Sequence, residues 1–380
     1  MKLPDQRFWR GKRVFVTGHT GFKGSWLVAW LHDLGARVFG YALPPLTDPA
    51  LFNSARLAEH CEVDTQADVR NAFRLEESLT NAEPEVVFHL AAQALVRTSY
   101  AQPRETFDTN VGGTLNLLEA VRKRGRPCAV VIVTSDKVYV DQEHGRPYRE
   151  SDALGGRDPY SASKAAAEMV AASYRSSYFP PNRLAEHGIA LATVRAGNVI
   201  GGGDWSLDRI LADAVRSFSV GAPLSLRNPA SIRPWQHVLD PLAGYLILAR
   251  EMVENPSPQW CGAWNFGPSQ DAEITVGELA AKFAEAWGGG AISDASDHRA
   301  PVETKTLRVN IEKAVSELPW RPVWNVEEAV RRTAAWYRLF YESPRESALR
   351  LCLADLRAYT SLAAEDPTVR RGRPCDAIAN

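Results

Sequence analysis

Residues 13–24 read RVFVTGHTGFKG, and this stretch decides the fold. Its first five residues form a β-branched and aromatic run, which predicts a strand that stops at Gly18. The apolar residues of the segment 26–31 then fit a helix that ends at Gly35. A strand, a glycine turn and a helix therefore follow one another in this order.

Further apolar runs extend this pattern along the chain. They predict strands at 37–43, 86–90, 129–133 and 190–196, with helices between them at 107–124 and 161–178. Nearly all-apolar strands suit a parallel sheet that is covered on both faces. The alternation predicts an α/β fold with a doubly wound parallel sheet of the Rossmann type.

A less regular pattern follows Gly201-Gly202-Gly203, with more proline and tryptophan, and predicts a smaller C-terminal substrate-binding lobe. We expect the sheet domain to comprise residues 1–202 and 232–262, the lobe 203–231 and 263–340, and a helical extension 341–380. Ser343 as N-cap and Pro344 at the first helical position predict a helix to about Ala363. Residues 370–374 are expected to form a frayed tail.

Charge and cysteine content exclude several classes of protein. The 380 residues include 44 basic and 45 acidic side chains, a net charge of -1, which supplies no field for nucleic acid. No run of about 18 apolar residues and no secretion signal is present, so we expect no membrane partner and a cytoplasmic location. The cysteines are odd in number, lack metal-site spacing and are expected to be reduced: Cys61, Cys128, Cys261, Cys352 and Cys375.

The glycine turn has the features of a dinucleotide site. Its three glycines allow a tight turn, close approach of a pyrophosphate and close packing of helix on strand, and the helix N-terminus faces the anion. A purely structural turn is the alternative, which the position between strand and helix disfavours. The expected cofactor-binding residues of this turn are Gly18, Thr20, Gly21, Phe22, Lys23 and Gly24.

The end of the second strand carries no carboxylate for the ribose hydroxyls, since it reads Phe39-Gly40-Tyr41-Ala42. This test therefore leaves NAD and NADP open. Asp68 and Val69 are placed to meet the adenine, although a solvated turn explains them equally well.

Tyr160 and Lys164 lie four residues apart, on one face of a predicted helix. A free phenol titrates near pH 10, and a neighbouring ammonium lowers that pKa, so Tyr160 is a candidate base. An ordinary amphipathic helix is the alternative. The glycine turn, together with Thr134-Ser135 at the end of an apolar strand, favours the catalytic interpretation.

Several segments together resemble the extended short-chain dehydrogenase/reductase family and, within it, the CDP-glucose 4,6-dehydratases of deoxysugar biosynthesis. The resemblance covers about residues 8 to 340, and Asp136-Lys137 and 233–238 are its most specific parts. The segments are TGHTGFKGSW (17–26), HLAAQ (89–93), TSDK (134–137), LGGRDPY (154–160), RAGNVIGGGDW (195–205), RPWQHV (233–238) and WNFGP (264–268).

The resemblance implies bound NAD, a nucleotide-sugar substrate such as CDP-glucose, and a homodimer or dimer of dimers formed through the helices 107–124 and 161–178. It implies that Tyr160 deprotonates the sugar 4-hydroxyl with Lys164 beside it, while Thr134 or Ser135 hydrogen-bonds the same oxygen. Leu90, Ala91 and Ala92 are expected to line the cofactor.

Water is then eliminated across C5 and C6. Asp136 is the candidate acid, which requires burial to raise its pKa. Lys137 is either the base at C5 or an electrostatic partner of the enolate. A surface Asp–Lys pair is the alternative for both residues.

The substrate-binding candidates are side chains suited to a diphosphate or a sugar. A guanidinium can bind two phosphate oxygens at once, although a structural ion pair suits the arginines equally, and His237 and Trp235 favour packing. The candidates are Gln93, Ser135, Asn198, Arg209, Arg233 and His237, with Asn110 as a weaker one.

Two departures from the family pattern are present. Val302-Glu303-Thr304 replaces an expected His-Glu-Ala triplet, and Val138 replaces a cysteine. The first leaves the nucleotide open. A nucleotide-sugar 4-epimerase, which needs no elimination pair, and a non-catalytic cofactor-binding module are the competing functions.

Overall fold

The computed structural model describes residues 3–141, 145–269, 273–296, 308–343 and 347–365. Its centre is a seven-stranded sheet in which every pair of neighbouring strands is parallel. The spatial order is β11 (Ala263–Phe266), β6 (Ile189–Ala196), β5 (Cys128–Val133), β4 (Val86–His89), β1 (Arg13–Thr17), β2 (Arg37–Ala42) and β3 (Val63–Gln66). This doubly wound order confirms the predicted fold class.

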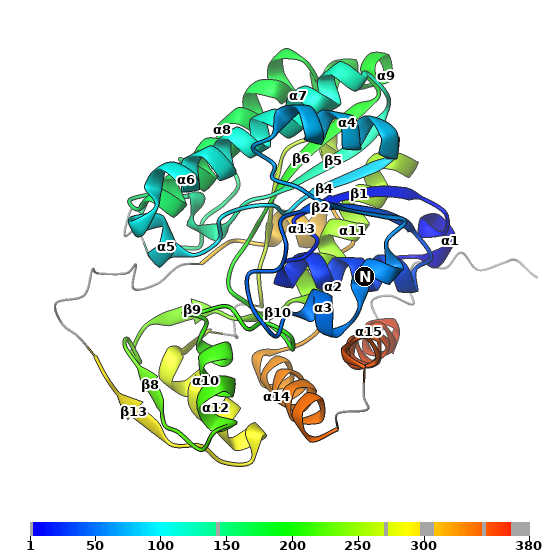
Figure 1. Ribbon diagram of the computed structural model, residues 1–380. Coiled ribbons are helices and arrows are strands. Elements are labelled where there is room, and N and C mark those ends of the chain that lie inside the picture. The colour runs from blue at the N-terminus through cyan, green and yellow to red at the C-terminus, as the bar shows by residue number, and fades with distance from the viewer. Residues whose placement is uncertain (1–2, 142–144, 270–272, 297–307, 344–346, 366–380) are drawn as a thin grey trace, which may run out of the picture.

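Helices cover both faces of the sheet (Figure 1). One face carries α4 (Ala72–Ala82), α7 (Gly113–Arg124) and α8 (Pro159–Ser177), and the other carries α2 (Phe22–Asp33) and α11 (Leu239–Glu254). Alternate residues of each strand face opposite sides. In β5, Val130 and Ile132 pack in the cluster under α7 and α8, whereas Val131 and Val133 pack in the cluster formed with α2 and α11.

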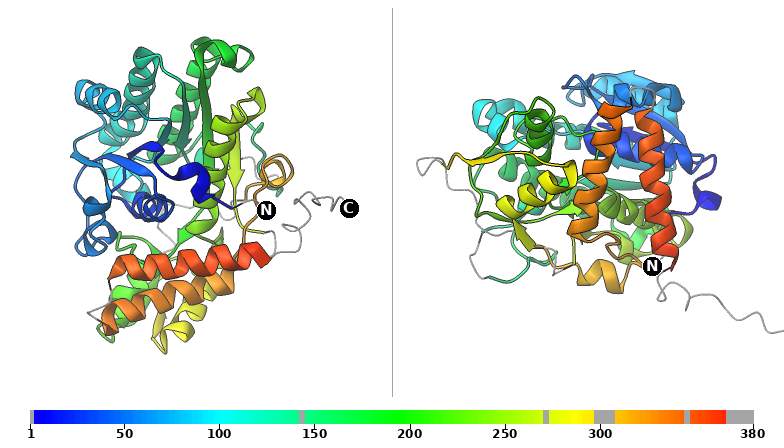
Figure 2. Two further views of the ribbon diagram at one scale, coloured as in Figure 1. Left: turned by 90° about the vertical axis from the view of Figure 1, so that its right-hand side faces the viewer. Right: turned by 90° about the horizontal axis from the view of Figure 1, so that it is seen from below.

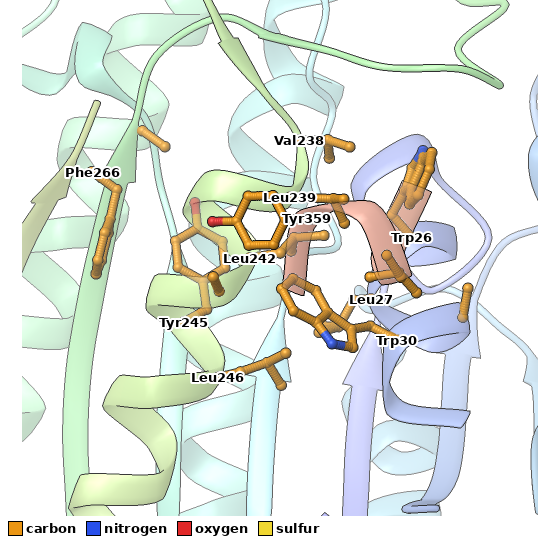
Figure 3. Packing of buried hydrophobic residues seen from close by; sticks show 14 of the residues in the cluster. Trp26, Leu27, Trp30, Val238, Leu239, Leu242, Tyr245, Leu246, Phe266 and Tyr359 are labelled. Atoms are coloured by element: carbon orange, nitrogen blue, oxygen red, sulfur yellow. The ribbon is translucent and has the colours of Figure 1, made fainter. Parts of the chain in front are cut away.

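The C-terminal helix α15 (Ala348–Glu365) is part of the core. Figure 3 shows its Tyr359 between Trp30 of α2 and the apolar face of α11. The Tyr359 and Trp30 rings meet edge to face at 5.8 Å, and Tyr359 Oη donates to Asp240 Oδ1 at 2.9 Å. Helix α15 therefore packs against α2, the helix that follows the glycine turn.

The predicted start of this last helix is wrong. Ser343 is the C-cap of α14 (Val326–Glu342), and α15 begins at Ala348, while Pro344 lies outside the described residues. The two helices lie side by side in both views of Figure 2. Residues 370–374 and the triplet Val302-Glu303-Thr304 also lie outside the described residues.

The smaller lobe is built from short paired strands and helices, which lie together below the sheet in Figure 1. The strand pairs are β7 (Val199–Ile200) with β10 (Gln236–His237), β8 (Leu224–Leu226) with β13 (Ile292–Asp294), and β9 (Ile232–Pro234) with β12 (Glu273–Thr275). The helices are α10 (Ile210–Phe218) and α12 (Val276–Trp287), whereas α13 (Glu312–Ser316) lies beside β11 of the main sheet. Residues 263–266, which the sequence assigned to the lobe, form β11 and pair with β6 in the main sheet.

Shorter helical elements connect these parts. They are α1 (Gln6–Trp9), α3 (Leu51–Ser54), η1 (Leu57–His60), α5 (Val96–Ala101), α6 (Pro103–Phe107), the π-helical turn η2 (Asp108–Gly112), η3 (Asp136–Val138), η4 (Pro181–Arg183), α9 (Leu184–His187) and η5 (Pro258–Trp260). Within the described ranges, four cysteines are unpaired and no helix has the length and apolar character needed to cross a bilayer.

Candidate active site

The glycine turn joins β1 to α2 with the close packing that its glycines predict. A Cβ on Gly18, whose φ is 72°, would lie 2.5 Å from Ala91 N, and one on Gly24 would lie 2.1 Å from Gly18 O. Gly21 is the N-cap of α2 and offers no side chain, so the first N–H groups of the helix stay available to an anion. These residues fit the pyrophosphate of a dinucleotide.

Hydrogen bonds connect the glycine turn to the end of β2 and to the loop after β4. Thr20 Oγ1 donates to Leu43 O at 2.7 Å, and Thr17 Oγ1 accepts from Ala91 N at 3.2 Å. The bond from Ala91 holds residues 90–92, the expected cofactor-lining segment, beside the glycine turn.

Asp68 and Val69, the two residues predicted at the adenine, follow β3. Val69 is buried beside Gly113, whereas the Asp68 carboxylate binds the Arg70 guanidinium at 2.5 Å. Tyr41 Oη donates to Asp68 O at 2.9 Å. The Arg70 pair lowers the pKa of Asp68, so this carboxylate stays an acceptor.

Tyr160 and Lys164 lie on the first two turns of α8, which Asp158 caps by accepting a bond from Ser161 N at 3.0 Å. Lys164 Nζ donates to Val133 O at 3.1 Å, which ties the helix to the end of β5. Burial and, to a smaller extent, the charge of Lys23 together lower the pKa of Lys164 to about 8.

The pKa of Tyr160 is raised, which is opposite to the shift expected from Lys164 alone. Burial raises this pKa, whereas a hydrogen bond with Ser135 and the charge of Arg209 lower it by less. The phenol is therefore neutral at pH 7 in the chain by itself, and its use as a base requires further positive charge beside it.

The side chains of Thr134 and Ser135 have different partners, so the prediction that Thr134 is a catalytic residue is corrected. Thr134 Oγ1 donates to Glu168 Oε1 at 2.6 Å, in the buried space between the sheet and α8. Ser135 instead lies beside Tyr160 and donates to Asp136 Oδ1 at 3.1 Å. Of the two hydroxyls, only that of Ser135 can reach an oxygen held by Tyr160.

Asp136 and Lys137 form the short turn η3 that follows β5. Asp136 is 2% exposed, and its Oδ2 has no hydrogen-bond partner among the described residues. Burial raises the pKa of Asp136 against the opposing charges of Lys137, Lys23 and Arg233. A Cβ on Gly197 would lie 2.8 Å from Oδ2, so this glycine leaves room for the carboxyl.

Gln93 does not have the free amide that a substrate contact needs. Its Oε1 accepts from Leu95 N at 2.6 Å, and its Nε2 donates to Thr106 Oγ1 at 2.9 Å. Asn110 also serves the scaffold, since its Nδ2 donates to Ser163 Oγ at 2.8 Å. The sequence prediction for Gln93 is therefore corrected: its side chain shapes the loop after β4.

A cavity of about 170 Å³ lies in the lobe. The predicted residues Asn198, Arg209 and Arg233 all line it, together with Asp208 and Arg227, which form an ion pair at 2.8 Å. The lining holds three aspartates, Asp204, Asp208 and Asp213, and three arginines, and it is the guanidinium groups that suit a diphosphate ester. Sequence reasoning missed Arg227 because no motif distinguishes it from a surface arginine.

His237 lies outside this cavity, so its assignment as a substrate ligand is wrong. The ring is fully buried, with Trp324 at 4.6 Å and Trp26 at 5.8 Å between centroids. Burial lowers the pKa of His237 to about 3. The residue is a neutral packing element between the sheet domain and α14.

Comparisons with known proteins agree with this geometry. The family model described as GDP-mannose 4,6 dehydratase matches residues 15–333. The CDP-glucose 4,6-dehydratase of Salmonella typhimurium is 47% identical over 336 residues, which cover 88% of this chain and 92% of that protein. A UDP-glucose 4-epimerase of Pisum sativum is 24% identical, covering 86% and 95% of the two chains.

A solved structure shares this architecture. The dTDP-glucose 4,6-dehydratase DesIV of Streptomyces venezuelae, with NAD bound, has a TM-score of 0.71 and 25% identity. The match covers 88% of this chain and 99% of DesIV.

Proposed function

The chain belongs to the GDP-mannose 4,6-dehydratase family of extended short-chain dehydrogenases/reductases, and we propose that it is an NAD-dependent hydro-lyase that converts CDP-glucose to CDP-4-keto-6-deoxyglucose. The observation that carries this proposal is the placement of a buried carboxyl, Asp136, beside the Ser135–Tyr160 pair. An epimerase needs the phenol but no acid for a departing hydroxyl.

NAD, when bound, supplies the acceptor for the hydride of the sugar C4 and the donor of hydride to C6. Tyr160 takes the proton of the 4-hydroxyl, and Ser135 hydrogen-bonds the same oxygen. Lys164 provides a cation beside them, and its protonated form favours the phenolate.

The residues of the turn η3 serve the elimination. The C5 proton becomes acidic next to the 4-ketone, and Lys137 accepts it as a neutral amine. The ammonium that forms stabilises the enolate and returns the proton to C5 when hydride reaches C6. The C6–O bond then breaks, and the departing oxygen takes the proton of Asp136 and leaves as water. The raised pKa of Asp136 keeps that proton available.

The lobe cavity is the proposed site of the nucleotide. Arg209 and Arg233 are assigned to the diphosphate, and Asn198 to a hydrogen bond with it. The 47% identity to a CDP-glucose enzyme supports cytosine as the base.

We also propose that two copies of the chain pair through α7 and α8, in the cytoplasm, in the supply of deoxysugars for lipopolysaccharide. Apolar side chains on or next to these helices are exposed: Phe107, Leu115 and Met169 are 39%, 40% and 54% exposed. Light scattering of the wild type and of a Met169→Glu variant tests this pairing, which a monomeric wild type would contradict.

Incubation with CDP-, dTDP- and GDP-glucose tests the function. We expect a 4-keto-6-deoxy product, which absorbs ultraviolet light in alkali, from CDP-glucose in preference to the other two. Conversion of glucose to galactose stereochemistry without loss of water identifies an epimerase instead. No conversion of any nucleotide glucose contradicts both enzymatic functions.

A further inference from the structure

A buried ion pair lies behind the active site and has no part in the mechanism above. Glu168 follows Lys164 by one turn on α8, and Arg195 lies on β6. The two side chains are 2% and 3% exposed, and their contact is bidentate, with Arg195 Nε at 3.0 Å from Oε1 and Nη2 at 2.9 Å from Oε2. Thr134 and Thr193 complete the set by donating to Oε1 and Oε2 at 2.6 and 2.7 Å.

The alternation of side chains along each strand brings these groups to the same face of the sheet. Thr134 continues the even-numbered residues of β5, which face α8, and Thr193 and Arg195 continue the odd-numbered residues of β6, which face the same helix. All four bonds to the carboxylate therefore arise on one face of the sheet. Burial alone would raise the pKa of Glu168, but the bonds from Arg195 and the threonines outweigh it and lower that pKa.

The same network holds the turn η3 at both ends. Thr134 precedes Ser135 and Asp136, and Tyr139 is the C-cap residue after the turn. Arg195 Nη1 donates to Tyr139 Oη at 2.9 Å, and that hydroxyl donates to Asn265 Oδ1 at 2.6 Å. The turn with Asp136 and Lys137 is thus fixed to the carboxylate of α8 from one side and to the guanidinium of β6 from the other.

We propose that Glu168 and Arg195 are positioning residues that hold the acid-bearing turn η3 in register with Tyr160 and Lys164 on α8. The inference rests on the proposed function, because it states which two groups of reacting residues must keep a fixed separation. A buried ion pair contributes little to the net free energy of folding, and its best-supported role is to fix the relative positions of the elements that it joins. Displacement of a reacting group by about 1 Å can cost about 100-fold in rate.

Two mild variants each remove one link from the turn. Thr134→Val deletes the hydroxyl at its start, and Tyr139→Phe deletes the hydroxyl at its end, while Thr134→Ser keeps the first link. Tyr359→Phe is the matched control, since it removes a buried phenol-to-carboxylate bond of 2.9 Å to Asp240, in the core beneath α2.

We expect kcat of the full-length enzyme with NAD and CDP-glucose to fall by about 10- to 100-fold in Thr134→Val and Tyr139→Phe, with little change in KM. Thr134→Ser and Tyr359→Phe should keep the kcat of the wild type. Hydrogen exchange measured by mass spectrometry should accelerate over residues 134–140 in the first two variants and only around α15 in the control.

Wild-type kcat in both Thr134→Val and Tyr139→Phe would overturn the proposal, since the pair would then be only part of the scaffold. A fall in kcat that follows the fall in melting temperature across all variants, including Tyr359→Phe, would also overturn the proposal. If the wild type converts no nucleotide glucose, the proposed function fails by itself. Exchange over 134–140 still decides whether the ion pair holds the turn, since unchanged exchange rejects it.

Discussion

Replacing Asp136 by asparagine separates the elimination from the oxidation. Asparagine has nearly the same shape, and its Oδ1 can still accept the bond from Ser135 at 3.1 Å. Its amide cannot give up a proton to the departing hydroxyl. General acid catalysis contributes about 10²- to 10⁴-fold, so we expect kcat to fall by that factor, or about 3 to 5 kcal/mol of transition-state stabilisation.

The structure predicts that stability is preserved. The Oδ2 that becomes an amide nitrogen has no hydrogen-bond partner among the described residues, so no bond is lost. We expect the free energy of unfolding to change by less than about 1 kcal/mol. A loss of rate without a loss of stability is the signature of a chemical role.

The assay follows absorbance at 340 nm after mixing the enzyme and NAD with CDP-glucose. Asp136→Asn should accumulate reduced cofactor, because oxidation at C4 proceeds while loss of water stalls. Asp240→Asn is the control: Asp240 is fully buried, its Oδ1 accepts a bond from Tyr359, and its Oδ2 has no hydrogen-bond partner among the residues that the structure describes. A wild-type rate in Asp136→Asn, or an equal loss in Asp240→Asn, would refute the assignment of the acid.

Three further measurements bear on the neighbouring groups. Tyr160→Phe should lower kcat/KM by about 10²-fold or more and abolish the rise at 340 nm, because the base is gone; a persistent rise points to another base. Lys164 must be protonated, so activity should fall as the pH rises through about 8. Lys23→Met removes a like charge and should therefore move this fall to higher pH. An unchanged fall in activity at alkaline pH would contradict an effect of Lys23 on the pKa of Lys164. Burial raises the pKa of Asp240 to about 7, so its contribution to stability is present at low pH and lost as the pH rises towards 7. The melting temperature of Asp240→Asn should therefore exceed that of the wild type at pH 8 but not at pH 4. A difference in melting temperature that is the same at both pH values would disprove this raised pKa.

Local patterns were sufficient to predict the sheet, the glycine turn and the Tyr160–Lys164 pair. Each depends on residues close together in sequence: a run of apolar residues, three glycines within seven positions, or two side chains one helical turn apart. The structure also places Asn198, Arg209 and Arg233 around one cavity, although Asn198 follows β6, Arg209 is the N-cap residue of α10 and Arg233 lies in β9.

The errors arose where a contact depends on the folded chain and not on a local sequence pattern. His237 is buried by Trp26 and Trp324, and no residue adjacent to it in sequence indicates these partners. The amide of Gln93 is used by Leu95 and Thr106, through a loop geometry that composition does not encode. Strand β11 was assigned to the lobe because its run of four residues is too short to be distinguished from irregular structure.

The choice between Thr134 and Ser135 has a more general cause. A strand buried on both faces is apolar throughout, so the usual alternation that marks the two faces is missing from residues 128–133. Only the partners of Val130 and Val131 show which face α8 covers, and from them the direction of Thr134 follows. The polarity of Glu168, four residues after Lys164, was the one signal available in the sequence.

The pKa of Asp136 is raised because the effect of burial exceeds the opposing effect of the nearby cations. Lys23, Lys137 and Arg233 are near enough to favour the carboxylate, yet none donates a hydrogen bond to Oδ2 in the part of the chain described. A charge acting at a distance compensates less for lost hydration than a direct bond does. Oδ2 is buried in the space that Gly197 leaves for it, so burial favours the protonated carboxyl beside these cations. An acid and several cations therefore lie near one another, because burial favours the protonated carboxyl more than these cations favour the carboxylate.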